Sequence, residues 1–239
     1  MIELSVTNPT ILWKKLGNLF FGCCPPIDIQ LGDRRFISIG NTFEVQNWPK
    51  TWRGRALMDL VGYSPNGYKM ELLRKTYVNE DKWKEFRKVV RSTNKGFSAQ
   101  GMNFNMSIEK KGGCLSSLHL IRNREKNILV IHGKIAEIPR KFVADLLLVR
   151  DLLQELNLWP IEVRFMYSTI YYSIVGLRAY IPVLGKDHMD FHNLPIDTPR
   201  NYQAGIIEAI NKVGERFTPK ERREGIWTRI NQVTGEWED

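Results

Sequence analysis

The sequence has little cysteine: Cys23, Cys24 and Cys114 are the only three in 239 residues. Three cysteines, two of them adjacent, do not form the even and spaced set that a disulfide-rich secreted domain requires. The adjacent pair also lacks the spacing of a zinc knuckle, and of the four scattered histidines only His188 and His192 lie four residues apart. Because a third ligand is missing there, we expect neither a disulfide framework nor a metal site.

Long apolar runs, internal repeats and low-complexity tracts are also missing. No run approaches the roughly 20 apolar residues that a transmembrane helix needs, and residues 1–10 lack the basic and apolar regions of a signal peptide. Hydrophobic residues make up 43% of the chain and aromatic residues 11%, which is typical of a folded protein and not of a disordered one. We therefore expect one cytoplasmic domain spanning residues 1–239, large enough to bury a substantial core.

Basic residues outnumber acidic ones, 35 to 26, which gives a net charge of +9. A basic surface attracts phosphates, but the charge alone fits a nucleotide enzyme, a DNA-binding protein or simply a basic protein. Apolar positions 83, 86, 89 and 90 predict a helix over Asp81–Arg91 with its cations on the solvated face. The candidates for nucleic-acid contact are Lys82, Lys84, Arg87, Lys88 and Arg91, with Arg222 and Arg223 near the C-terminus. We expect only weak duplex binding, lost near physiological salt.

The most informative stretch begins at Cys114. From there to Ile131, two apolar segments flank a short charged break, which predicts a β-hairpin. Apolar residues then recur at three- and four-residue steps from Phe142 to Leu156 and predict a helix buried along one face. Trp159-Pro160 ends this helix, because the residue before a proline is disfavoured in the helical region. A second apolar strand follows from Ile161 to Val175.

These patterns predict an α+β fold. The sheet is expected to be mixed or antiparallel, with strands near residues 36–45, 102–108, 114–122, 128–134 and 161–175. A long central buried helix is predicted at about 140–156. Asn8 is the expected N-cap of the first helix, with Pro9 at its first position. The flanking helices are expected at 10–21, 56–61, 70–77, 81–91, 202–217 and 220–230.

The order of these features resembles the thymidylate synthase and dCMP hydroxymethylase superfamily over roughly Asp33 to Leu184. In that family a nucleophilic Cys begins a strand, a polar residue follows five positions later, and a basic-Ser-x-acidic element precedes a long buried helix and a strand with His-x-Tyr. The matching positions here are Cys114, His119 in place of the usual Gln, Lys134-Ile135-Ala136-Glu137, and Tyr172.

The resemblance implies a role for each of these residues. Cys114 is the expected nucleophile at carbon 6 of a pyrimidine, since a thiolate is strongly nucleophilic near neutral pH. Glu137 is the expected acid or base, or the group that positions a water. Lys134 neutralises a phosphate or activates the thiol, His119 hydrogen-bonds the base or ribose, and Tyr172 bonds a ribose hydroxyl. Structural alternatives stay open: Cys114 is a buried cysteine without a chemical role, and His119 is a strand histidine whose hydrogen bonds are made within the protein.

The resemblance also implies a phosphate site, a carbon donor and a partner subunit. Arg34 and Arg35 lie where the family has an arginine-bearing loop, and a planar guanidinium suits phosphate oxygens; a solvated turn is the alternative. The carbon donor is methylenetetrahydrofolate, although the C-terminal tail does not match the segment that closes over the folate. A homodimer is expected through the sheet face, with Tyr167 and Tyr171 as aromatic anchors.

Other positions depart from the family pattern. Ile170 replaces the His of His-x-Tyr, the phosphate-binding arginine pair is missing from residues 92–101, and the pyrimidine-binding Asn falls near Arg140 or Lys141. The turn after Glu137 is also about three residues shorter than in the phage-type pattern.

Three functions therefore stay open. The first is a divergent pyrimidine nucleotide carbon-5 methyl- or hydroxymethyltransferase, for DNA hypermodification or precursor supply. The second is a thymidylate synthase-like protein that has lost the chemistry and binds nucleic acid or a protein. The third is an unrelated α+β domain. The first is slightly favoured because Cys114, Glu137 and Tyr172 occur together.

Overall fold

A computed structural model describes residues 2–22, 29–31, 34–61, 74–75, 77–92, 102–107, 115–122, 126–173, 176, 180, 183 and 218–238, with only the backbone described for 20–22, 29–31, 34–39, 102–107 and 222. The described elements are, in chain order, β1 (Ile2–Val6), α1 (Pro9–Gly22), β2 (Ile29–Leu31), β3 (Arg34–Val45), α2 (Arg55–Leu60), α4 (Glu80–Ser92), β4 (Met102–Ser107), β5 (Leu115–Arg122), β6 (Asn127–Ile138), α5 (Arg140–Leu156), β7 (Ile161–Ser173), α8 (Pro219–Glu224) and the 3-10 turn η3 (Trp227–Arg229).

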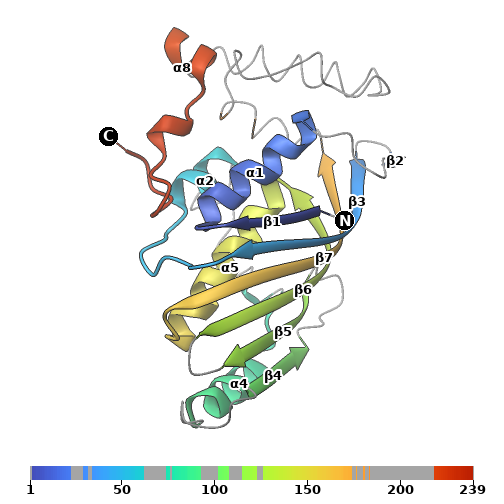
Figure 1. The fold of residues 1–239 in the computed structure, drawn as a ribbon, viewed down its shortest axis with the longest axis vertical. Coiled ribbons are helices and arrows are strands. Elements are labelled where there is room, and N and C mark those ends of the chain that lie inside the picture. The colour runs from blue at the N-terminus through green and yellow to red at the C-terminus, as the bar shows by residue number, and fades with distance from the viewer. Residues whose placement is uncertain are drawn as a thin grey trace.

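Seven strands form one mixed sheet within the described residues, in the order β1-β3-β7-β6-β5-β4 with β2 paired to β3 (Figure 1). The pairs β1–β3 and β6–β7 are parallel, and the other pairs are antiparallel. Parallel neighbours need a crossover connection, usually a helix, and α5 makes the connection between β6 and β7. The predicted α+β class with a mixed sheet is therefore confirmed, whereas the short strand β1 was not predicted.

The helix predicted at 140–156 forms as α5, and its apolar residues Phe142, Leu146, Val149 and Leu153 are buried. Phe142 packs edge-on against Phe165 of β7, with ring centroids 5.3 Å apart. The expected central position is wrong, however. The helix lies in a layer against one face of the sheet, and the paired strands β3, β7 and β6 occupy the middle of the described fold (Figure 1).

Helix α1 packs beside α5 and against β1 and β3. Its predicted cap is confirmed, because the backbone N–H of Ile11 donates to the Asn8 side-chain oxygen at 2.9 Å. The indole N–H of Trp13 donates to the carbonyl of Pro139 at 2.8 Å and so ties α1 to the start of α5.

The predicted helix 220–230 is shorter in the structure. Thr218 and Glu221 form a capping box at its start, but α8 ends at Glu224 because Gly225 has a positive φ of 79°. Of the other predicted helices, 202–217 and most of 70–77 lie outside the described residues. None of the described helices combines the length and apolar character that a membrane-spanning segment requires.

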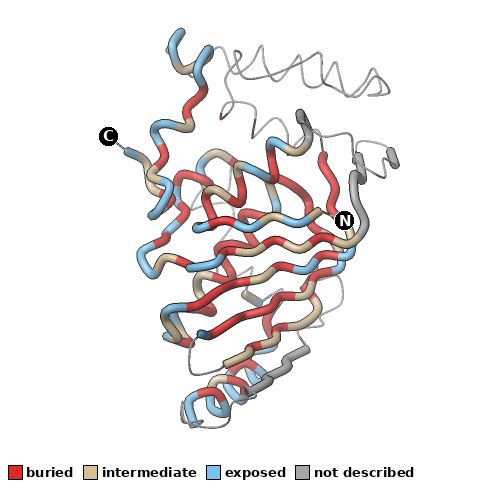
Figure 2. Tube along the Cα trace, in the orientation of Figure 1, coloured by how far each residue is buried: buried red, intermediate tan, exposed pale blue. Residues whose placement is uncertain are grey.

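The sheet has two unlike faces, which we call the helix face and the open face. The helix face packs against α1 and α5 and carries buried residues such as Phe165 and Tyr167. The open face, which none of the described helices covers, carries Lys134 and Met166, both exposed. Figure 2 shows the buried and exposed stretches along the strands. Such one-sided packing explains the alternation of buried and less buried positions over residues 41–45 of β3 and 163–168 of β7.

Candidate functional site

A buried carboxylate at the end of β6 is the most highly connected of the predicted site residues. Glu137 is 5% exposed. Its Oε1 accepts a hydrogen bond from Ser173 Oγ at 2.7 Å, and its Oε2 accepts one from the Tyr171 hydroxyl at 3.2 Å. The ammonium of Lys141 lies 3.0 Å from the same Oε2. A buried acidic group is tolerated when donors of this kind surround it.

The parallel pairing of β6 and β7 assembles this cluster. Glu137 is the register partner of Tyr171, and Ser173 lies two residues further along the same face of β7. Lys141 reaches back from the first turn of α5, four residues after Glu137. Gly176 packs against the other side, since a Cβ there would lie 3.4 Å from Oε1 of Glu137. The sequence reasoning missed all four neighbours; only the four-residue spacing to Lys141 was a usable signal.

Tyr172 does not join this cluster. Its hydroxyl donates to the backbone carbonyl of Leu16 in α1 at 2.5 Å, so its side chain lies on the helix face. Tyr167 also points to the helix face, where its hydroxyl donates to Asp145 of α5 at 2.7 Å. Residues five apart in a regular strand point to opposite faces. The alternation of β7 therefore shifts by one residue between Tyr167 and Tyr172, which turns Tyr171 toward Glu137.

Two other strand pairs are irregular toward this end of the sheet. The register of β3 against β7 shifts between Phe36 and Ser38, and that of β5 against β6 shifts between Leu115 and Ser117. An extra residue in one strand locally increases the twist and redirects side chains. The first shift lies beside Tyr171 and the second beside Gly133 of β6, four residues before Glu137.

His119 and Lys134 lie apart from the Glu137 cluster. His119 is half-buried on β5 and pairs with Val130 of β6. Val130 precedes Glu137 by seven residues, which corresponds to roughly 23 Å along a strand. His119 is therefore not beside the Glu137 carboxylate. Lys134 is exposed and lies three residues before Glu137 on β6.

The arginine pair lies in a strand and not in the predicted turn. Arg34 and Arg35 begin β3 and pair with Ser173 and Tyr172, so their backbone lies beside the Glu137 cluster. Their side chains and the whole of Cys114 lie outside the described residues. In sequence, Cys114 directly precedes Leu115, which opens β5 and pairs with Gly133 of β6.

Tyr167 and Tyr171 do not supply the predicted aromatic anchors of a dimer face. Both side chains are buried, at 1% and 6% exposure. The Tyr167 hydroxyl is engaged beneath α5 and that of Tyr171 by Glu137. The prediction was wrong because it assigned both side chains to the solvent side of the sheet.

No group of three histidine, cysteine or carboxylate side chains suited to a metal occurs among the described residues, and His188 and His192 lie outside them. No model of a known protein family matches the sequence. A comparison with curated proteins gives no significant match either. The likeness to thymidylate synthases therefore depends on the pattern of residues in the sequence alone.

Proposed function

We propose that this protein is a divergent carbon-5 methyl- or hydroxymethyltransferase of pyrimidine nucleotides, acting in the cytoplasm. The observation that supports this function best is the cluster of Tyr171, Ser173 and Lys141 around the buried Glu137. The order of hairpin, buried helix and tyrosine-rich strand also agrees with the resemblance.

The strand registers support this proposal in part. Arg34 pairs with Ser173, beside Glu137, whereas Leu115, which follows Cys114, pairs with Gly133, four residues before Glu137. In the proposal, Cys114 adds to carbon 6 of the base, which makes carbon 5 nucleophilic. Glu137 moves a proton or orients a water, and Lys141 with the β3 arginines holds the phosphate.

Methylenetetrahydrofolate is the carbon donor that the resemblance implies, with a C-terminal segment that closes over it. The described C-terminal residues are engaged elsewhere: the N–H of Arg53 donates to the carbonyl of Thr234 at 2.6 Å, and the Trp237 indole donates to Asp59 at 2.9 Å. This segment does not fit the closing role, so no step of the proposed reaction is assigned to the folate.

Release of tritium from carbon 5 of a labelled nucleotide tests the proposal. We expect exchange with one of dUMP, dCMP, UMP or CMP when folate is supplied, and none with Cys114→Ala. Glu137→Gln should lower the rate by about 10²- to 10⁴-fold, the usual range for a general acid or base. Glu162→Gln is the matched control, because Glu162 is also a buried carboxylate, 8% exposed, paired with Lys126 on the same sheet.

The alternative is a fold that has lost the reaction. Two observations favour it. The Tyr172 hydroxyl already donates its hydrogen bond to a carbonyl of the protein, and His119 lies far from Glu137. Under this alternative the wild-type protein shows no exchange with any of the four nucleotides. That result would reject the transferase and leave a binding protein.

We further propose that two copies pair through the open face. Met166 is 40% exposed there, between its register partners Thr42 of β3 and His132 of β6. Methionine is enriched in protein interfaces relative to the rest of the surface.

A further inference from the structure

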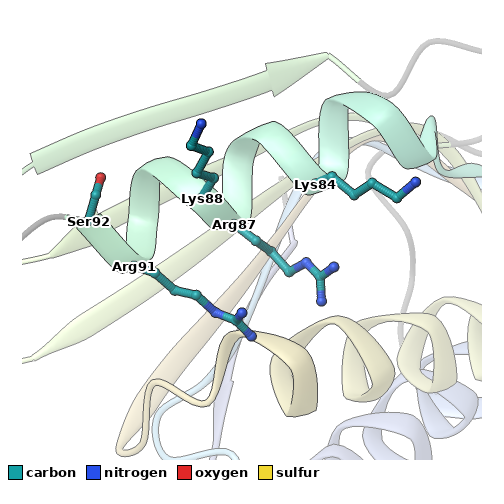
Figure 3. A pocket seen from close by; sticks show the side chains of 5 residues that line it. All are labelled: Lys84, Arg87, Lys88, Arg91 and Ser92. Carbon is teal, nitrogen blue, oxygen red and sulfur yellow. The ribbon is translucent and has the colours of Figure 1, made fainter.

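Helix α4 presents an unbroken row of cations on one side. Lys84, Arg87, Lys88, Arg91 and Ser92 line a single surface pocket of about 450 Å³ (Figure 3). Their spacing of three and four residues places them along one stripe of the helix. The acidic residues of α4, Glu80, Asp81 and Glu85, are not part of the lining. Lys82, which the sequence grouped with these cations, also lies off the pocket.

The stripe is held on a rigid support. Buried Trp83 donates its indole N–H to Glu155 Oε2 of α5 at 2.9 Å. The same oxygen lies 2.5 Å from Arg87 Nη1, and Arg91 Nη2 donates to the Glu155 carbonyl at 3.3 Å. Figure 3 shows both guanidiniums directed toward the end of α5. Fixing the arginine side chains in advance removes part of the entropy cost of binding.

The charge of the pocket is only partly compensated. Glu155 compensates the charge of Arg87, and Arg74, which also contacts Glu155, is bound by both carboxylate oxygens of Glu80. No carboxylate of α5 or of Glu80 is paired with Lys88 or Arg91 among the contacts of the described residues. Lys84 lies 3.8 Å from Asp81, but both side chains are largely exposed, and such surface pairs contribute little. The Ser92 hydroxyl donates to the Val89 carbonyl, so the four cations provide the available donors. A positive charge therefore remains along the stripe.

We propose that this pocket binds the phosphate backbone of nucleic acid. Lys84 and Arg91 are seven residues apart, about 10 Å along the helix axis. Four successive phosphates of one DNA strand span the same length, because each rises about 3.4 Å along the DNA axis. The lining contains no apolar side chain. Four cations and a serine, with no carboxylate in the lining, suit an anion such as phosphate.

The proposed nucleotide site and this pocket lie at opposite ends of α5. Lys141 is in its first turn and Glu155 in its last, about 21 Å apart along the helix. The backbone-binding site therefore does not depend on the proposed transferase activity. The sequence alone favoured a solvated face for these cations. Their common position along one pocket, and the anchoring of Arg87 and Arg91 by Glu155, favour a binding site.

Fluorescence anisotropy with a labelled 20-base-pair DNA duplex, titrated from 50 to 200 mM NaCl, tests the proposal. Four cations predict a slope of about −3.6 in log affinity against log salt, hence a loss of about 150-fold over this range. In Lys84→Gln/Lys88→Gln the slope should fall to about −1.8, with a loss of only about 12-fold. The control Lys82→Gln/Lys220→Gln removes the same charge from exposed positions off the pocket and should keep the wild-type slope.

Two outcomes would overturn the proposal. If both double variants lose the same amount of affinity for the duplex, the net charge of the protein, and not the stripe of cations, attracts the DNA. Absence of wild-type binding at 50 mM NaCl, or equally tight binding of a polyglutamate peptide, would remove nucleic acid as the ligand. All four lysines are exposed, so the variants should fold, which far-UV circular dichroism will check.

Discussion

Asp145 makes the stability of this protein depend on pH in a way that one substitution will test. The carboxyl group lies inside the core on α5, where its Oδ2 accepts a hydrogen bond from Tyr167 at 2.7 Å. Asn41, the register partner of Tyr167 on β3, is also buried and carries no charge. Burial raises the pKa of Asp145 from 3.8 to about 7, and the hydrogen bond from Tyr167 opposes this only in part.

The direction of the effect follows from proton linkage. The folded protein holds the Asp145 proton up to a pKa of about 7, whereas the unfolded chain releases it near 3.8. The contribution to stability is therefore fully present below pH 3.8 and is lost as the pH rises through 7. A difference of about three pKa units corresponds to about 4 kcal/mol, since one unit is 1.36 kcal/mol.

Asp145→Asn should remove this loss, because an amide of the same size accepts the Tyr167 hydrogen bond without ionising. The variant is expected to be more stable than the wild type by up to about 4 kcal/mol at pH 8. The difference in free energy of unfolding between the variant and the wild type should shrink by about 1.4 kcal/mol for each pH unit from pH 7 down to pH 5. Urea unfolding of both proteins at four pH values measures this difference.

Asp151→Asn is the matched control on the same helix. Asp151 is partly exposed and paired with Arg150 at 2.6 Å, so its substitution should not produce a gap that grows with pH. A constant difference between Asp145→Asn and the wild type from pH 5 to pH 8, or a less stable variant at pH 8, would refute the reasoning.

Two further predictions concern the surfaces of the sheet and of α4. Met166→Lys, on the open face, should convert the proposed dimer into a monomer, which sedimentation velocity will show. If the wild type is already a monomer at about 10 µM, a concentration at which a complex of micromolar Kd is mostly formed, the dimer is contradicted. Glu155→Ala should lower the free energy of unfolding by about 1–3 kcal/mol, because the buried Trp83 N–H loses its acceptor and Arg87 loses its carboxylate partner, while Arg74 keeps Glu80. A loss below about 0.5 kcal/mol in urea unfolding, the range of neutral surface substitutions, would show that α4 does not depend on this contact.

Short-range patterns in the sequence were sufficient for most of the elements. The helical spacing from Phe142 to Leu156 placed α5 correctly, and the two apolar segments around the charged break predicted the hairpin of β5 and β6. β6 nevertheless extends to Ile138, beyond the predicted end at 134, and β1 was missed. A five-residue strand such as β1 gains its stability from pairing with β3, which is distant in sequence and invisible to a local pattern.

The grouping of side chains depended on the tertiary structure. The sequence identified Glu137, but its partners Tyr171 and Ser173 follow more than thirty residues later and are brought beside it by the parallel register of β6 and β7. The shift in alternation between Tyr167 and Tyr172 then decided that Tyr171, and not Tyr172, faces Glu137. Periodicity is a property of neighbouring residues and can be read along the chain. Register and strand irregularity follow from pairing and packing across the whole sheet, so the fold alone determines them.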